Sequence, residues 1–245
     1  MNRKQVLTNK VKKGPRKIKV RQMFDKISSN YDLMNRIISA GIDIKWRKNV
    51  VKLIAPKKPK KILDVATGTG DLAIALGETL ATEIVGIDIS EEMLEIGKKK
   101  VDKSPWYKNI KMKIGDGEKI TYPDNYFDAV TVSFGVRNFE NLDKGLMEIF
   151  RVLQPGGELI ILETAVPQNF LLHQLYKLYT YYVIPIIGSL FSTDKSAYKY
   201  LSSSANTFPF GKAFNNILEK NGFLVKGSIP QSFGVAFIYH AKKPI

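Results

Sequence analysis

The stretch ILDVATGTGDLAIALGE, residues 62–78, decides the expected fold. An apolar run leads into a Thr-Gly-Thr-Gly turn, and a helical pattern of apolar residues follows the turn. The turn fits the pattern G-x-G-x-x-G/A, with Gly68, Gly70 and Ala73 at the marked positions. A strand, a glycine-rich turn and a helix in this order are typical of an α/β domain that binds a nucleotide.

Strands and helices alternate from residue 61 onward, which predicts a mostly parallel sheet with helices on both faces. The segments LVKGSIP and GVAFIYHAKK near the C-terminus have no helix between them, so they are expected to pair antiparallel at one edge. The expected fold class is therefore α/β, with a Rossmann-like sheet and an antiparallel edge hairpin. We expect strands near 61–66, 83–88, 110–116, 126–134 and 158–164, and helices near 71–80, 91–102 and 141–153.

Three parts are expected along the chain. Residues 1–21 are basic and contain no acid, which predicts a flexible tail. Residues 22–55 carry apolar side chains at three- and four-residue spacing and are expected to form an N-terminal helical cap. Gly41 is expected to end the first helix of the cap, and Asp43 to cap the second. Residues 56–245 form the main domain, which a Pro/Lys string joins to the cap.

The composition narrows the possible partners. The chain has 245 residues, of which 44% are hydrophobic, enough for a substantial core. Lys and Arg number 38 against 23 Asp and Glu, and the net charge of +15 favours anionic partners such as membrane phospholipid, nucleic acid or acidic substrates. The absence of cysteine excludes disulfides, thiolate metal sites and a cysteine nucleophile, and it fits a reducing compartment.

Two acids near the glycine turn indicate which ligand it accepts. Asp64 and Asp71 flank the turn, and both would repel a pyrophosphate placed at the start of the following helix. S-adenosylmethionine carries an amino group and a sulfonium, so it suits such a site. Asp88 ends the second expected strand, where an acid accepts from ribose hydroxyls. Asp116, followed by Gly117 at the end of the third strand, can accept from an adenine amino group. A purely structural glycine turn is the alternative.

Four further stretches support a family resemblance. YDLMNRIISAGIDIKW (31–46) and RVLQPGGELIILE (151–163) look like two family signatures, with SFGVRN (133–138) between them. YYVIPIIGSLFSTDKSAYKYLSSS (181–204) looks like a late insertion of the same family. From about Phe24 onward, the chain resembles the ubiquinone/menaquinone biosynthesis C-methyltransferases, which are class I S-adenosylmethionine-dependent methyltransferases.

The chain departs from the family pattern at three positions. Asp43 stands where the family usually has His, which puts in question any role that needs an imidazole there. Gln154 replaces a usual Lys and Ala165 a usual Ser, both around the turn into the fifth strand or just after it.

The resemblance implies a class I methyltransferase fold and S-adenosylmethionine as the methyl donor, with no metal. It implies cofactor contacts at five positions, and the residues of the glycine loop complete the expected site. The candidate cofactor-binding residues are Asp64, Gly68, Thr69, Gly70, Asp88, Asp116, Gly117 and Ser133.

The resemblance also implies C-methylation of a polyprenylated quinol, most readily demethylmenaquinol to menaquinol. The benzoquinol precursor of ubiquinone is the alternative substrate. The candidate catalytic residues are Arg137, Tyr31 and Asp32. Arg137 can stabilise an oxyanion because a guanidinium stays charged, although it can also simply pair with a nearby acid. Tyr31 and Asp32 are expected to orient the quinol and accept its proton.

A helical insertion is expected at about 167–204. Lys177 and Pro185 interrupt its apolar run, so no transmembrane span is expected. The insertion is either an amphipathic helix at the sheet edge or an apolar lid over a prenyl tail. We expect a cytoplasmic protein in peripheral contact with the inner face of an anionic membrane. A homo-oligomer or a complex of quinone-biosynthesis enzymes is compatible with the sequence.

Other functional classes fit the sequence less well. A basic RNA-binding protein or RNA methyltransferase would explain the charge, but no aromatic-rich RNA platform is evident and no nucleic acid partner is expected. A binding protein without activity would not need the acids of the loop. A nicotinamide oxidoreductase conflicts with those acids most directly.

Overall fold

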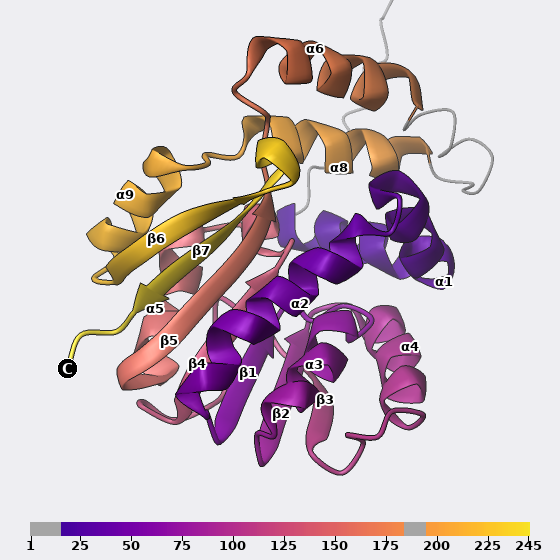
Figure 1. Cartoon of the computed structure of the whole chain (residues 1–245). Coiled ribbons are helices and arrows are strands. Elements are labelled where there is room, and N and C mark those ends of the chain that lie inside the picture. The colour runs from indigo at the N-terminus through magenta and orange to yellow at the C-terminus, as the bar shows by residue number, and fades with distance from the viewer. Residues whose placement is uncertain (1–15, 184–194) are drawn as a thin grey trace, which may run out of the picture.

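The computed structural model describes residues 16–183 and 195–245. Its centre is a sheet with the strand order β3-β2-β1-β4-β5-β7-β6 (Figure 1). Among the described strands only β7 runs opposite to the rest, since it pairs antiparallel with both β5 and β6. The predicted fold class is confirmed. The strands are β1 (Lys61–Val65), β2 (Glu83–Asp88), β3 (Ile110–Ile114), β4 (Phe127–Ser133), β5 (Leu153–Thr164), β6 (Leu224–Gln231) and β7 (Ala236–Lys242).

Different helices cover the two faces of the sheet. Side chains alternate along a strand, so Leu63 packs with α5 and α9 whereas Ile62 packs with α2, α3 and α4. Both faces of the central strands are therefore buried, which explains their nearly continuous apolar sequence. The bounds of the helices are α2 (Ile42–Ile54), α3 (Asp71–Leu76), α4 (Glu91–Val101), α5 (Leu142–Val152) and α9 (Lys212–Lys220).

A second group of helices lies at the carboxyl edge of the sheet. Helix α1 (Arg16–Ser39) packs against α4 and α8 (Lys195–Thr207) through a small cluster of buried side chains around Ile27, Met93 and Ala197. Figure 1 places α6 (Phe170–Leu178) beyond α8, at the top of the molecule. A π-helical turn, η4 (Tyr179–Val183), continues α6. These helices cover the edge at which ligands of α/β proteins bind.

The N-terminal segment differs from expectation in three ways. Helix α1 begins at Arg16, before the boundary expected at residue 22. Helix α2 packs on the sheet through Trp46 and its neighbours, so it is one of the covering helices of the main domain. Asp43 does not cap α2, because Gly41 occupies the cap position with a positive φ of 75°. Asp43 lies in the first turn and is buried.

The described part of the insertion comprises α6, η4 and α8, and residues 184–194 lie outside the described residues. The predicted interruption at Pro185 falls within that range and lies outside the described residues. No helix within residues 16–183 and 195–245 is long and apolar enough to cross a membrane.

Candidate active site

The glycine turn follows β1 and leads into α3. Gly68 and Gly70 have φ values of 57° and 79°, a left-handed conformation that glycine adopts without strain. The Gly68 amide donates to Asp88 Oδ2 over 2.8 Å, which joins the turn to the end of β2. The Asp88 side chain therefore holds the turn at the carboxyl edge of the sheet.

Asp88, the last residue of β2, lies beside this turn and faces a cavity. Its carboxylate accepts from the Gly68 amide and from the Ser90 amide at 2.9 Å. Burial raises the pKa of Asp88, and these backbone bonds offset part of the rise. The side chain lines a cavity with Gly68 and Phe24. It is placed to accept hydrogen bonds from a ligand there.

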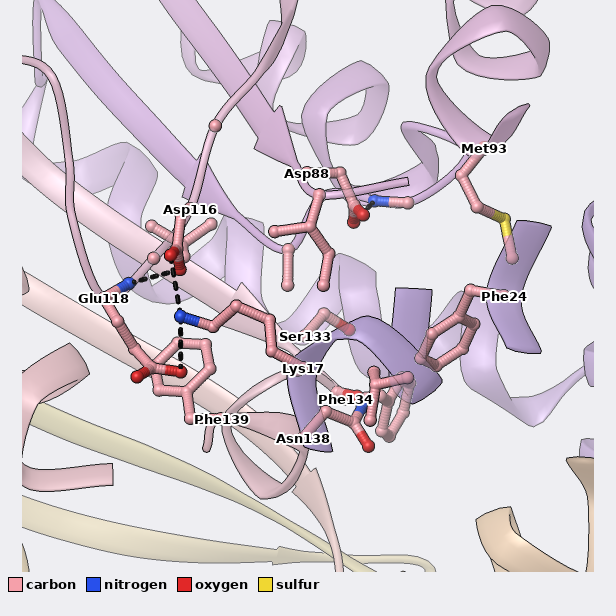
Figure 2. Close-up of a pocket in the computed structure, with 18 of the residues that line it drawn as sticks. Lys17, Phe24, Asp88, Met93, Asp116, Glu118, Ser133, Phe134, Asn138 and Phe139 are labelled. Carbon is pink, nitrogen blue, oxygen red and sulfur yellow. Dashed lines mark hydrogen bonds and ion pairs between the residues drawn. The ribbon is translucent and has the colours of Figure 1, made fainter. Parts of the chain in front are cut away.

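Asp116 and Glu118 form the opposite wall of this cavity, as Figure 2 shows. Lys17, from the start of α1, donates to Asp116 over 2.7 Å and lies 3.3 Å from Glu118. Lys17 thus occupies the carboxylate that a nucleoside at this wall would use. A nucleoside that hydrogen-bonds to Asp116 would compete with Lys17 for it.

Ser133 and Gly117 complete the candidate cofactor site. Ser133 ends β4 and lines the cavity, and its buried hydroxyl has no hydrogen-bond partner among the described residues. A Cβ at Gly117 would lie 2.8 Å from Val65 Cγ1, so the backbone approaches the cavity wall more closely there than a larger residue allows. Within the described residues, no group of acids and histidines could hold a metal ion.

Three of the predicted cofactor residues do not line the cavity. Asp64 lies under the turn and accepts from Thr67 and Thr131, each at 2.6 Å. Thr69 donates to Asp32 over 2.5 Å, on the outer side of the turn. Gly70 shapes the turn through its φ without facing the cavity. These residues shape the glycine turn without contacting the cavity.

Asp71, the second acid beside the glycine turn, does not line the cavity. Asp71 pairs with Arg36 at 2.7 Å and with Lys100, and Arg47 lies 3.7 Å away. Burial alone would raise the pKa of Asp71, but the nearby charges of Lys100 and Arg47 lower it. The cations of the protein already neutralise this acid, so the acids that face the cavity are Asp88, Asp116 and Glu118.

A second, larger cavity of about 560 Å³ adjoins the first. Tyr31 and Phe134 line both cavities and so lie at their junction. The walls of the larger cavity come mainly from α1, α2, α6 and the tip of the β6–β7 hairpin. Its apolar lining residues include Ile38, Ile42, Trp46, Leu172, Leu175, Tyr176, Leu201, Phe233 and Val235.

Among the described residues, Arg137 is one of two buried arginines that line the larger cavity, and Arg47 is the other. It lies in the 3₁₀ turn η3 (Val136–Asn138) that follows β4. Its Nη1 donates to the carboxylate of Glu163 and to the Phe134 carbonyl at 2.9 Å. Its Nε is buried without a hydrogen-bond partner among the described residues. Arg137 therefore pairs with an acid, as one interpretation expected, and also lines the cavity, as the other required.

The predicted catalytic residues Tyr31 and Asp32 lie on different sides of α1. Tyr31 faces the cavities, and burial raises the pKa of its phenol, so it remains a neutral hydrogen-bond donor at neutral pH. Asp32 lines neither cavity and pairs with Lys100 at 2.6 Å. Successive residues of a helix point about 100° apart, which directs these neighbours to different sides of α1. The prediction that Asp32 accepts a proton in the site is not supported.

Sequence reasoning missed a cluster of charges on the wall of the larger cavity. Arg36 and Arg47 both donate to Asp43 Oδ2, and the Ser39 hydroxyl donates to Asp43 Oδ1 over 2.7 Å. Arg36 also donates to Asp71 next to the glycine turn, so the cluster connects the wall of the larger cavity to the start of α3. Helical spacing between Asp43 and Arg47 was the available signal, because residues four apart share a helix face.

Comparison with known proteins places these cavities in context. The sequence matches the ubiE/COQ5 methyltransferase family over residues 10–243. The chain belongs to this family. The enzyme is therefore an S-adenosylmethionine-dependent methyltransferase.

Relatives of this methyltransferase cover nearly its full length. The demethylmenaquinone methyltransferase of Bacteroides fragilis is 42% identical over 231 residues, 94% of each chain. The ubiquinone/menaquinone biosynthesis C-methyltransferase UbiE of Geobacter sulfurreducens is 41% identical over 244 residues, covering 99% of this chain and 94% of that one.

Solved structures share the fold at low sequence identity. The [4+2]-cyclase SpnF has a TM-score of 0.65 and 16% identity, over 92% of this chain and 95% of that one. An S-adenosylmethionine-dependent methyltransferase of Thermotoga maritima has a TM-score of 0.63 and 17% identity, over 91% and 99%. A cyclase and a methyltransferase on one fold show that fold alone does not define the reaction.

Proposed function

We propose that the enzyme transfers a methyl group from S-adenosylmethionine to a ring carbon of demethylmenaquinol, which yields menaquinol. The observation that carries the proposal is the junction of two unlike cavities, one lined by acids and one largely apolar, at Tyr31 and Phe134. The relatives named demethylmenaquinone methyltransferase support this substrate. The apolar cavity suits a naphthoquinol ring and the first part of a prenyl chain.

The methyl donor is proposed to bind in the smaller cavity. Asp88 accepts from the ribose hydroxyls, and Asp116 accepts from the adenine amino group once Lys17 withdraws. The Ser133 hydroxyl contributes a hydrogen bond that it lacks within the described residues. Asp64, Thr69 and the loop glycines hold the turn in shape. The bound donor supplies an electrophilic methyl group on a sulfonium.

The quinol is proposed to react as its phenolate. Loss of a phenolic proton makes the ring carbon beside the oxygen nucleophilic, and this carbon forms a bond to the methyl group as the bond from sulfur to methyl breaks. The ring carbon then loses its hydrogen as a proton, which restores the aromatic ring. Arg137 stabilises the phenolate, and the neutral Tyr31 phenol donates to the quinol. Since Lys100 holds Asp32, we assign proton removal to water.

The benzoquinol precursor of ubiquinone is a second candidate substrate. Relatives that are about 41–43% identical carry the combined ubiquinone/menaquinone name. The same phenolate chemistry applies to either ring, so the residues at the junction do not favour one of them.

An anaerobic assay with labelled S-adenosylmethionine and both reduced quinols tests the proposal. We expect label on a ring carbon of demethylmenaquinol, located by mass spectrometry of the product. Oxidised quinone should not react, because its ring is electron-poor. Label on oxygen, or label transferred to RNA but to neither quinol, would contradict the proposal.

We further propose that the enzyme acts on the cytoplasmic side of a membrane, in peripheral contact with it. A polyprenylated quinol is confined to the bilayer, and the net charge of +15 attracts the protein to anionic lipid.

A further inference from the structure

Exposed apolar side chains are concentrated on helix α6 and the turn after it. Helix α6 has no buried residue, although it is largely apolar. Its outward side chains are Phe170, Leu171, Leu175 and Leu178, with exposed fractions of 77%, 66%, 55% and 56%, and Tyr181 and Tyr182 follow at 79% and 63%. A surface of this kind marks an interaction site.

The tip of the β6–β7 hairpin adds a further exposed aromatic residue. Phe233 lies in the turn η5 (Ser232–Gly234) and is 84% exposed. Its φ is 60°, a left-handed conformation that is unfavourable for a residue with a side chain. The fold thus maintains both a strained backbone and an exposed phenyl ring at this position.

Both features border the mouth of the larger cavity. Ile42, Leu175 and Phe233 line this cavity and are at least 40% exposed. The opposite side of α6 lines the same cavity through Leu172 and Tyr176. We define the apolar rim as the exposed apolar residues of α6 and η4 from Phe170 to Tyr182, together with two residues of other elements. Its members are Phe170, Leu171, Leu175, Leu178, Tyr181, Tyr182, Ile42 and Phe233. The rim surrounds the opening through which an apolar substrate would enter.

The positive charge of the C-terminal part of the chain indicates an anionic partner for the rim. From Ala165 to the C-terminus the sequence has eight lysines and only two acids, Asp194 and Glu219. Lys177 on α6 and Lys45 on α2 are exposed close in sequence to rim residues. Apolar and aromatic side chains flanked by lysines, without acids, are complementary to an anionic bilayer surface.

We propose that the apolar rim inserts into the head-group region of an anionic bilayer, so that the larger cavity opens directly toward the acyl chains. This inference rests on the proposed function, because it assumes that the cavity receives a membrane-confined quinol. Phe233 and the outward residues of α6 enter the bilayer, and lysines near the rim contact the lipid phosphates. The substrate then reaches the junction at Tyr31 without crossing water.

Substitution of Phe233 by glycine separates binding from folding. Glycine accepts the positive φ, so F233G should be as stable as the wild type or more stable. Binding to vesicles of phosphatidylglycerol and phosphatidylcholine should fall about tenfold in a sedimentation assay, since one buried phenyl ring is lost. L171S, which changes a rim residue outside the cavity lining, should weaken binding in the same direction.

Leu80 provides a matched control. It is also a non-glycine residue at positive φ, 61°, with a 75% exposed apolar side chain. It precedes β2 and therefore lies at the amino edge of the sheet, away from the rim. L80G should bind vesicles like the wild type. If F233G and L171S also bind like the wild type, or if F233G and L80G lose binding equally, the proposal is wrong.

Two further measurements are needed. One tests whether a second copy of the chain, instead of a bilayer, covers the rim, and the other tests the proposed function separately from membrane binding. Analytical ultracentrifugation shows whether the wild type is a dimer and whether F233G dissociates it. A dimer that depends on Phe233, together with no vesicle binding by the wild type, would assign the rim to a second copy and overturn the proposal. Methylation of a short-chain quinol without vesicles tests the reaction separately, and L171S should retain it. Rim-dependent binding without quinol methylation would contradict the proposed function but not the docking surface.

Discussion

Arg137 combines a buried ion pair with access to the proposed substrate. We predict that Arg137→Ala lowers the single-turnover rate of methyl transfer by about 100-fold, since it removes the cation that we propose stabilises the phenolate. S-adenosylmethionine affinity should change little, because Arg137 lines only the larger cavity. Raised pH should partly restore the rate of the variant if ionisation of the phenol is the step that Arg137 assists.

A control is needed because Arg137→Ala leaves Glu163 buried without its ion pair. The double variant R137M/E163Q removes both charges and keeps the volume similar. Rapid-quench measurements should show the same loss of rate in both variants. An unchanged rate in the double variant would return Arg137 to a purely structural role.

Asp64 affects the pH dependence of stability. Burial raises the pKa of Asp64 to about 6, and hydrogen bonds from Thr131 and Thr67 limit the rise. The folded state therefore binds a proton more tightly than the unfolded state, so this residue lowers stability as pH rises from about 4 to about 6.

We predict that Asp64→Asn becomes more stable relative to the wild type as pH rises through this window, by about 1–3 kcal/mol. Urea unfolding at several pH values measures the difference. A constant difference between the two proteins from pH 4 to pH 7 would show that Asp64 titrates alike in both states.

At the scale of the element, the start of α1 determines whether the cofactor cavity is accessible. Lys17 occupies Asp116, and Arg16 donates from its backbone to Glu140 at 3.0 Å and from its side chain to the Arg137 carbonyl at 2.9 Å. The first turn of α1 thus contributes Lys17 to the cavity lining, where it would compete with a ligand for Asp116.

We predict that Lys17→Ala binds S-adenosylmethionine several-fold more tightly, by about 0.5–1 kcal/mol, because the competing partly exposed ion pair is lost. Lys19→Ala is the matched control, since Lys19 is exposed on the same helix and the charge change is identical. Isothermal titration calorimetry compares the two. Weaker binding by Lys17→Ala alone would mean that Lys17 contacts the ligand instead of competing with it.

For the molecule as a whole, the cofactor cavity joins the glycine turn, the ends of β2 and β4 and helix α1. A ligand there should stabilise the folded state as a unit. At about 100 times its dissociation constant, S-adenosylmethionine should add about 2.7 kcal/mol, which corresponds to roughly 5–10 °C in Tm.

Asp88→Ala should reduce this thermal shift at the same ligand concentration, because lost hydrogen bonds weaken binding by about 1–3 kcal/mol. Glu95→Ala removes an exposed acid of α4 and should keep the full shift. Scanning calorimetry distinguishes the two. Equal shifts in both variants would remove Asp88 from the ligand site.

Local pattern in the sequence was sufficient for the framework. The alternation of apolar strands with amphipathic helices determined the order of the elements, since each period depends on neighbouring residues. The glycine turn and Asp88 were predictable for the same reason, because a parallel strand brings its carboxyl end to a common edge. The Arg137 segment was placed correctly at the end of β4.

Only the tertiary structure decided which charges remain available. Asp71 meets Arg36 and Lys100 from other elements, and Asp116 meets Lys17, so distant pairing rather than sequence spacing neutralises them. The direction of Asp32 depends on the rotation of α1 about its axis, which packing against α4 and α8 determines. Phe233 lies beside the mouth lined by α6 because a hairpin at the C-terminus returns to the same edge of the sheet. Such contacts join residues far apart in the chain, and no local period encodes them.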